Sequence, residues 1–439
     1  MEGGRAARTS REGSKRLLAL PHFMALPRTF LTMSAVVLAT AACVDNRFIV
    51  KETQPSEALY TSLFPYYVEY CALSEIKKKP DHGVEVVGGG AGGHALLFLS
   101  GVCRVPGAGY PTVALCPPEA LKPGLGVGVS VNAHFSNANW VATEGRDFFF
   151  RGLAEQGAPL TDELYWKTQA RARAMGILDG VVFHDEVMAS KPAGMDDQVF
   201  MYEMSVATDY GIALGRDRYC VRVPVERAEL GAVVDALNAA NDPYRKGEKT
   251  FEWDVVRNNC AHVIHNVLVP LRLWRHWPTD RFVVISALDF PVPKNELVAL
   301  VRLTNDKRLA RPSALYGDPP PGKGPGRRVG AAPGALVESE RVLRPNALYD
   351  TELESMFYEF PPFPLRERFL SFFANERYTD LAANLRWFSA RNRALLASPR
   401  GEALSSTQDD RGQIHRLYRS YLARQAETLE QWLAALPGP

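Results

Sequence analysis

The sequence predicts an α+β fold with an antiparallel sheet, and three observations support that class. Residues 127–131 alternate as Val-Gly-Val-Ser-Val, a period of two that is typical of a half-buried strand. Residues 226–241 have the apolar spacing of an amphipathic helix and end at Asn-Asp-Pro. Strand and helix patterns follow one another without a repeated β-α order, which disfavours a doubly wound parallel sheet.

The same signals assign the other elements in chain order. Residues 44–80 are expected to form a short linker and a helix whose aromatic side chains pack in the core. Residues 161–175 have helical composition, with Thr161 or Asp162 as the N-cap. Short apolar runs predict further strands at residues 84–87, 94–99, 199–207 and 218–225.

Four regions are expected along the 439 residues, a length that allows two or three domains. Residues 1–43 read as a targeting segment and 44–300 as one α+β domain. Residues 301–345, rich in Pro, Gly and Arg, read as a linker, and 346–439 as a helical region. The last helix repeats apolar residues at helical spacing, which predicts a packed face; a membrane-surface or partner helix is the alternative.

The targeting segment has the layout of a secretory signal. Residues 31–42 form an apolar run of about twelve residues, too short to span a bilayer. The run ends in Thr40-Ala41-Ala42, directly before Cys43. This junction resembles a bacterial lipobox, which implies lipidation of Cys43, a membrane anchor and a periplasmic lipoprotein. Cleavage after Ala42 without lipid, or a retained anchor, is the alternative.

Export changes how the six cysteines are interpreted, because disulfides persist in oxidising compartments. If Cys43 carries lipid, five cysteines remain, and an odd number leaves at least one unpaired. Cys103 and Cys116 flank a loop rich in Pro and Gly and are the favoured disulfide. A bridge between Cys71 and Cys220 is a second possibility, which would leave the remaining cysteine, at position 260, as a free thiol. Five reduced thiols are the alternative.

Cys260 is the first candidate for chemistry. It follows Asn258-Asn259 and opens an apolar helical stretch at 263–268, which places the thiol at a helix N-terminus. The positive end of the helix dipole favours the thiolate, the nucleophilic form. A buried, inert cysteine is the competing interpretation.

His94 is the candidate base for that nucleophile. It follows Gly92-Gly93 and begins the apolar strand at 94–99. A thiol–imidazole pair needs a third polar group to orient the ring. Along the strand at 127–131 and just beyond it, alternation places Ser130, Asn132 and His134 on one face. If this strand pairs with the His94 strand, His134 or Asn132 could orient the imidazole, and His134 is narrowly favoured.

Other functional signals are weak. Residues 88–93 formally match G-x-G-x-x-G, but a dinucleotide site needs a helix after the glycines and a strand follows here. His262 and His265 lie three residues apart, but a zinc site would also need Cys260 on the same helix face. The net charge of +2 gives no nucleic-acid footprint. No cofactor, metal or nucleic-acid partner is therefore expected.

Gly-Gly-His before an apolar strand, followed much later by Asn-Asn-Cys-Ala at a helix start, resembles the circularly permuted papain-like superfamily. That group includes permuted NlpC-type peptidases and lecithin:retinol acyltransferase-like enzymes. The details look closest to a bacterial envelope family related to the periplasmic domain of a lipoprotein N-acyltransferase. The resemblance covers roughly residues 84–300 and implies that Cys260 is the nucleophile and His94 the base. The third residue does not transfer, because an insertion at about 101–126 intervenes.

The resemblance and the export signal together imply a cell-envelope thiol enzyme that transfers an acyl group. Hydrolysis of a peptide or amide bond, as in cell-wall peptide, is the favoured reaction. An acyltransferase or lipase acting on lipid or lipoprotein acyl chains is the second expectation, and a non-catalytic envelope lipoprotein is the third.

Overall fold

The computed structural model describes residues 57–79, 93–282, 286, 290–305, 309, 311–317, 326–327, 332–350 and 365–436. All of them belong to one compact unit. The predicted targeting segment with Cys43, and the strand expected at 84–87, lie outside these residues.

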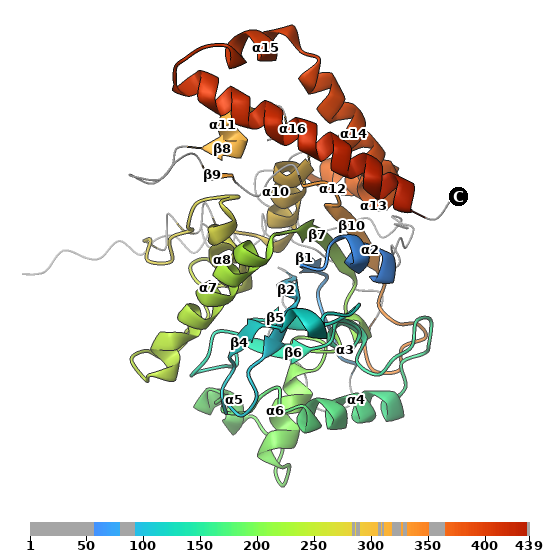
Figure 1. Cartoon of the computed structure of the whole chain (residues 1–439). Helices are drawn as coiled ribbons and strands as arrows, with labels where there is room; N and C mark the ends of the chain where they lie inside the picture. Colours follow the sequence, from blue (N-terminus) through green and yellow to red (C-terminus); the bar gives the residue numbers. More distant parts are fainter. Residues whose placement is uncertain are drawn as a thin grey trace, which may run out of the picture. The chain divides into compact units, whose positions relative to one another are not determined.

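A six-stranded antiparallel sheet forms the centre of the described structure, with the strand order β10-β7-β1-β2-β5-β6 (Figure 1). This confirms the predicted mixture of helices with an antiparallel sheet. The strands are β1 (Tyr67–Leu73), β2 (His94–Ser100), β5 (Gly126–Ser130), β6 (Val141–Glu144), β7 (Arg218–Pro224) and β10 (Leu336–Glu340). Two small ribbons pair β3 (Val102–Arg104) with β4 (Val113–Leu115), and β8 (Tyr316–Gly317) with β9 (Gly326–Arg327).

The helices fall into three successive groups along the chain. Before β7 come α2 (Glu57–Leu63), α3 (Arg146–Arg151), α4 (Asp162–Ala174), α5 (Asp185–Ala189) and α6 (Asp197–Ser205). Between β7 and β10 come α7 (Arg227–Arg245), α8 (Cys260–Val267), α10 (Pro293–Asn305) and α11 (Pro312–Leu315). After β10 come α12 (Leu365–Phe373), α13 (Glu376–Thr379), α14 (Leu381–Leu396), α15 (Pro399–Ser405) and α16 (Asp410–Ala435).

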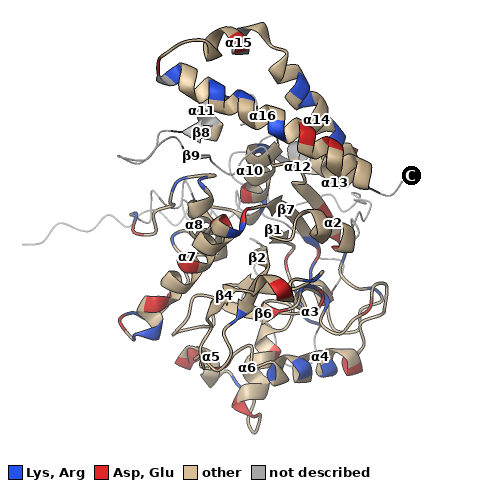
Figure 2. Ribbon diagram, in the orientation of Figure 1, with Lys and Arg blue, Asp and Glu red and all other residues tan. Residues whose placement is uncertain are grey.

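Two predicted helices begin with side-chain caps, and the cap of the first is one of the two residues predicted for it. Thr161 caps α4, because its side-chain oxygen accepts a hydrogen bond from the Leu164 N–H. Glu226 caps α7 in a reciprocal arrangement with Glu229. Both helices expose charged residues of both signs to solvent (Figure 2). No helix of the described residues is long and apolar enough to cross a membrane.

β1 corrects the prediction of a linker and helix at 44–80. The expected helix is only the short α2, and the aromatic run continues into the central strand of the sheet. β1 pairs with β2 on one side and β7 on the other, and every residue of β1 is buried. A strand covered on both faces lacks the polar alternation that identifies a half-buried strand, so its period is hidden.

Residues 199–207 were predicted as a strand and form α6 instead. Asp196 caps this helix by accepting a hydrogen bond from the Val199 N–H. Its residues from Phe200 to Ser205 are all buried. A short helix buried on every side gives the same continuous apolar run as a strand, so periodicity does not separate the two.

The prediction that 301–345 only links two regions is also wrong. α10 extends to Asn305, and β10 adds an edge strand beside β7. β10 was missed because its sequence, Leu-Val-Glu-Ser-Glu, carries two carboxylates that are nevertheless buried. Buried arginines satisfy both carboxylates, which residue-type propensity does not anticipate.

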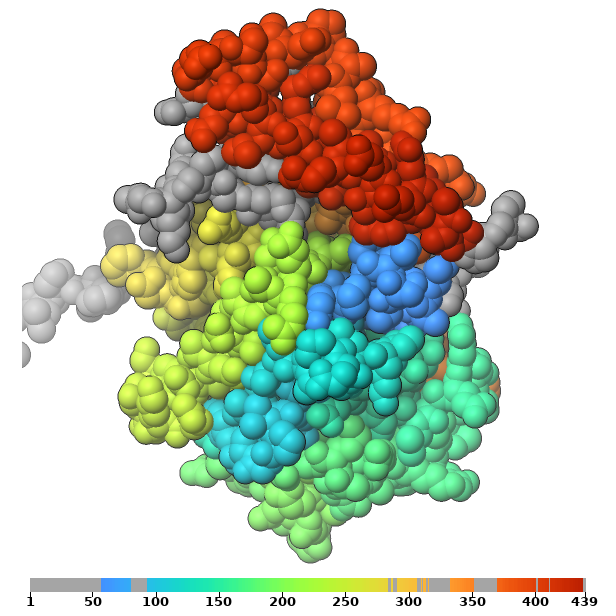
Figure 3. Space-filling view, viewed as in Figure 1, coloured from blue at the N-terminus to red at the C-terminus, as the bar shows by residue number. Residues whose placement is uncertain are grey.

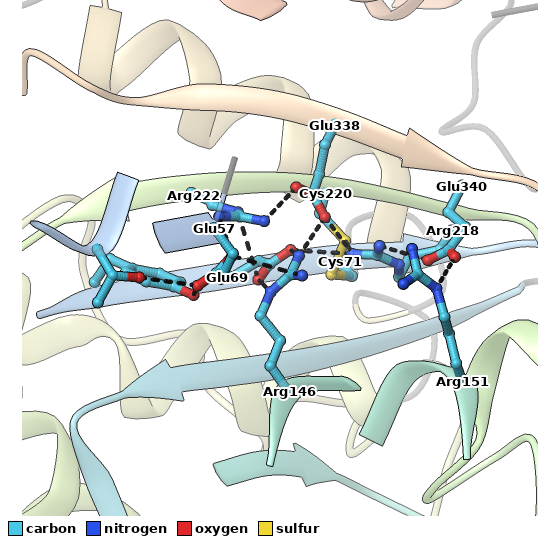
Figure 4. A network of polar contacts seen from close by, with 12 residues as sticks. Glu57, Glu69, Cys71, Arg146, Arg151, Arg218, Cys220, Arg222, Glu338 and Glu340 are labelled. Atoms are coloured by element: carbon cyan, nitrogen blue, oxygen red, sulfur yellow. Dashed lines mark hydrogen bonds and ion pairs between the residues drawn. A yellow bond between two sulfur atoms is a disulfide. The ribbon is translucent and has the colours of Figure 1, made fainter. Parts of the chain in front are cut away.

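Those carboxylates belong to a network of ion pairs on one face of the sheet (Figure 4). Arg146 of α3 and Arg218 of β7 both contact Glu69 and Glu338, with Arg146 Nη2 at 2.9 Å from Glu69 Oε1. Arg222 adds a bond of 2.6 Å to Glu338 Oε2. The three guanidinium groups hold the pKa of Glu338 well below its usual range. In this network, each of these buried arginines has a carboxylate partner.

The network also encloses a disulfide. Cys71 and Cys220 lie directly opposite one another in β1 and β7 and are bonded. Cys103 and Cys116, the favoured pair from the sequence, form the second disulfide, across the β3–β4 ribbon. Among the described residues Cys260 is the free cysteine.

Two hydrophobic clusters cover the two faces of the sheet. One includes Ala95, Leu97, Val129 and the buried residues of α8. The other joins β1 and β2 to the C-terminal helices, through Leu385 of α14 and Leu422 and Leu429 of α16, among others. The space-filling view shows α16 against the N-terminal α2 segment (Figure 3), where the Phe64 and Trp432 ring centroids lie 5.0 Å apart. The predicted packed face of the last helix is therefore confirmed.

Candidate functional site

Cys260 is the first residue of α8, as its sequence context predicts. Asn259 is the N-cap: its side-chain Oδ1 accepts a hydrogen bond of 3.0 Å from the His262 N–H. His262 Nδ1 in turn accepts a bond of 3.2 Å from the Asn259 N–H. This reciprocal cap satisfies two N–H groups of the first turn and fixes where the helix begins. The thiol is thereby held at the positive end of α8.

The amide nitrogen of Asn259 ties the same cap to two other segments. It donates to the carbonyl of Val255 at 2.7 Å and to the carbonyl of Pro291 at 3.3 Å. The loop before α8 and the segment before α10 therefore both meet at the cap. These bonds show that Asn259 shapes the turn before Cys260.

The sulfur of Cys260 contacts the backbone at the start of β2. It accepts the Ala95 N–H at 3.4 Å. Burial raises the pKa of the Cys260 thiol, and the N–H groups of Ala95 and of the helix start, together with the Arg216 charge, oppose that rise. The resting group is a buried thiol, and the surrounding N–H groups and the guanidinium favour its anion.

His94 begins β2 directly after Gly93, whose φ of +65° is in the left-handed region. Its Nε2 lies 2.9 Å from the hydroxyl oxygen of Ser130, and that hydroxyl donates to the Thr208 carbonyl at 2.7 Å. Ser130 has one proton and uses it toward Thr208, so it accepts from His94 Nε2–H. The unprotonated nitrogen of His94 is then Nδ1, the one able to act as a base.

His94 is held neutral. Burial, followed by the Arg216 charge, lowers its pKa to about 3, and the Thr208 backbone partly opposes both. The imidazole is therefore neutral at rest, and a pKa of about 3 makes it a weak base in this state.

The strand that carries the predicted orienting group does pair with the His94 strand, since Leu96 lies opposite Ser130. The residue that holds the His94 ring is Ser130, in place of the predicted His134 or Asn132. Asn132 instead donates to Asp209 Oδ2 at 2.9 Å. The His134 ring packs against Phe183, with centroids 5.6 Å apart.

Asp209 forms a second polar layer behind Ser130. Burial raises the pKa of its carboxyl to about 6, and hydrogen bonds from neighbouring side chains, Asn132 first, limit the rise. The turn that contains it is strained: Ala207 has a φ of 63°, which is uncommon for a residue with a side chain. Backbone strain of this kind persists only where the surroundings impose it.

Arg216 completes the site and is buried, with 2% of its surface exposed. Its Nη1 donates to the Ser74 carbonyl at 2.9 Å and its Nε to the Ala207 carbonyl at 3.2 Å. Within the described part of the chain these bonds go to carbonyls and to no carboxylate. Burial lowers the pKa of Arg216 to about 10, and the strongest opposing influence is the negative form of Cys260.

The Cys260 sulfur contacts the start of β2, and the His94 side chain leaves the same strand start on the other face of the sheet. Ala95 belongs to the hydrophobic cluster that includes α8, whereas Leu96 belongs to the cluster on the other face. Because side chains alternate along a strand, His94 shares the face of Leu96 and Ser130. The structure brings the Cys260 sulfur to the backbone beside His94, and brings the His94 ring to Ser130.

The described residues include one group of three potential metal ligands, Glu69, Cys71 and Cys220. Both sulfurs are bonded to each other, so this group does not offer thiolates to a metal. His265 is occupied by Glu296 at 2.7 Å and by the Arg275 carbonyl.

Sequence reasoning missed Thr208, Asp209 and Arg216, and it named Ser130 only as a neighbour of the preferred residues. No local pattern marks them, because they lie far from Cys260 in sequence and form the site only through the sheet and the turn at 205–210.

Searches of known protein-family models, curated proteins and solved structures find no match to this chain.

Proposed function

We propose that this protein is an exported, thiol-dependent acyl-transfer enzyme that uses Cys260 as its nucleophile. The observation that carries the proposal is a free cysteine at a capped helix start. Its sulfur accepts a hydrogen bond from the backbone N–H of Ala95, the residue after the buried, neutral His94. Thiolates at helix N-termini are reactive, and a neutral imidazole nearby accepts protons.

In the proposed reaction the Cys260 sulfur attacks the carbonyl carbon of the substrate, which forms a C–S bond. For this step the His94 ring must turn from Ser130 toward the sulfur; it then takes the thiol proton and gives it to the leaving amine or alcohol, whose bond to the carbonyl carbon breaks. Water or an amine then attacks the thioester and releases the thiol. The backbone N–H of Cys260 at the start of α8 is positioned to donate to the developing oxyanion.

Hydrolysis of a peptide or amide bond in the cell envelope is the first form of this proposal. The signal-like segment supports export, and lipidation of Cys43 would tether the enzyme to a membrane. The resemblance of the Gly-Gly-His and Asn-Asn-Cys motifs to permuted papain-like peptidases supports the reaction type.

A lipid or lipoprotein acyl chain is the second candidate substrate, and a specific feature favours it. Trp253 and Val255 are 38% and 53% exposed on the loop before α8, and the Val255 carbonyl accepts a bond from the Asn259 cap. Exposed apolar side chains beside a nucleophile suit an acyl chain better than a polar peptide.

Labelling with a thiol-reactive acyl probe tests the enzyme proposal. The wild type should be acylated at Cys260, Cys260→Ala should not, and His94→Ala should react at least about tenfold more slowly, as is typical for loss of a general base. His415→Ala, at a half-buried histidine of α16, is the matched control and should react like the wild type. Labelling that survives both site substitutions would contradict the proposal and favour a non-catalytic lipoprotein.

Substrate competition separates the two candidate substrates. Peptidoglycan fragments should suppress probe labelling if the substrate is cell-wall peptide, and phospholipid or lipopeptide vesicles should suppress it if the substrate is an acyl chain. Trp253→Ala should weaken competition only by the lipid, because an apolar contact adds little to a polar peptide.

A further inference from the structure

Arg216 is a buried cation whose hydrogen bonds, within the described residues, go to carbonyls and to no carboxylate. Arg146, Arg218 and Arg222 are equally buried, and each has carboxylates within 3.1 Å or less. Within the described residues Arg216 is hydrogen-bonded to the carbonyls of Ser74 and Ala207, while Asp209 and Glu75 act on its charge without a hydrogen bond to it. A buried charge without a bonded anion is costly, which suits a site where a further anion forms in use.

The backbone places this cation at the end of the sheet where the site forms. Leu73, the last residue of β1, lies opposite both His94 and Arg218. Ser74, just after β1, and Arg216, just before β7, therefore lie beside the start of β2. Ser74 and Asp217 then exchange two further hydrogen bonds, which fix this corner. Ser74 accepts the Arg216 Nη1–H at that corner.

The negative form of Cys260 is the anion to which the Arg216 charge is most strongly coupled, ahead of Tyr349 and Asp209. Arg216 is likewise the side-chain charge that favours the Cys260 thiolate. It acts on His94 in the opposite sense, against protonation. One fixed charge therefore favours the anion on sulfur and disfavours a cation on the imidazole.

We propose that Arg216 is the resident cation of the thiol site: it stabilises negative charge on the Cys260 sulfur, so that the thiolate does not depend on a protonated His94. The same guanidinium stabilises the substrate oxyanion that follows in acyl transfer. This inference deepens the proposed function, since it names a further residue of the same site. It differs from a thiolate–imidazolium pair, in which the histidine carries the positive charge.

The titration of the thiol tests this proposal without any substrate. Arg216 and Tyr70 are the titratable groups coupled to the sulfur, and Tyr349, Asp209 and Glu75 act on Arg216. His94 precedes Ala95, whose N–H the sulfur accepts. Iodoacetamide reacts with the thiolate, which forms a C–S bond and releases iodide. The rate at Cys260, followed by mass spectrometry of its peptide in the full-length protein, gives the titration midpoint against pH.

Arg216→Gln should raise the midpoint by one pH unit or more, which slows alkylation below the midpoint by about tenfold or more. Arg216→Lys keeps the charge and should shift it less. His94→Ala should leave the midpoint unchanged or lower. Arg245→Gln, at an exposed arginine paired with Asp242, is the matched control and should behave like the wild type.

An unchanged midpoint in folded Arg216→Gln, or a rise of one unit or more in His94→Ala, would overturn the proposal. A wild-type Cys260 that never reacts up to about pH 10 would overturn it as well. If Arg216→Gln does not fold, the His94→Ala midpoint decides alone. If acyl labelling fails but the thiol titration still depends on Arg216, the proposed enzyme is rejected and this inference stands.

Discussion

At the scale of single residues, His94 links the site to the stability of the fold. Burial lowers its folded-state pKa to about 3, whereas an unfolded histidine titrates near 6.5. Between these values the unfolded chain binds a proton that the folded chain does not. The contribution of neutral His94 to stability is therefore present above about pH 6.5 and lost as the pH falls toward 3.

Substitution of His94 by Gln should remove part of this acid sensitivity. Between about pH 7.5 and about pH 5, the wild type should lose about 2 kcal/mol more unfolding free energy than His94→Gln. Asp209, whose pKa is raised to about 6, works in the opposite sense, but it is present in both proteins. Denaturant titrations at the two pH values measure the difference, and equal losses would show that His94 is not buried as a neutral ring.

At the scale of elements, the turn into β2 depends on Gly93. Its φ is +65°, and a Cβ there would come within 2.3 Å of the Leu73 carbonyl oxygen. Gly93→Ala should cost about 1–2 kcal/mol for the left-handed backbone and more for the collision, and should displace His94. Gly109→Ala is the matched control, since its φ is +59° with no atom within 4 Å of the added Cβ. Thermal unfolding and alkylation of Cys260 should both respond more to the first change; equal responses would argue against a crowded turn.

The elements that the sequence identified carry a local signal. α7 and α16 have clear periods, and α4 and α8 have polar caps. β2 and β5 are buried on both faces, but a short apolar run marks the first and a period of two marks the second. β1, β10 and residues 200–205 of α6 are buried throughout, and burial of Glu338 and Glu340 depends on arginines distant in sequence. The same limit applies to the site: Cys260 and His94 carry local motifs, whereas Arg216 and Asp209 are defined only by tertiary contacts.

At the scale of the whole molecule, the C-terminal helices are part of the core that supports the sheet. Leu422 and Leu429 of α16 belong to the cluster that contains Phe98 of β2 and Leu336 of β10. A separate helical region would unfold without affecting the thiol site. A shared core instead couples the two, so that loss of packing in α16 exposes Cys260 at lower denaturant.

Leu429→Ala removes a fully buried side chain and should cost about 2–5 kcal/mol, the usual range for a large-to-small change in a core. Because the core is shared, the denaturant midpoint for alkylation of Cys260 should fall together with the midpoint for loss of helix by circular dichroism. Leu417→Ala, on the same helix but 37% exposed, should change both midpoints little. A fall in the helical midpoint with an unchanged Cys260 midpoint would show that α16 belongs to a region that unfolds on its own.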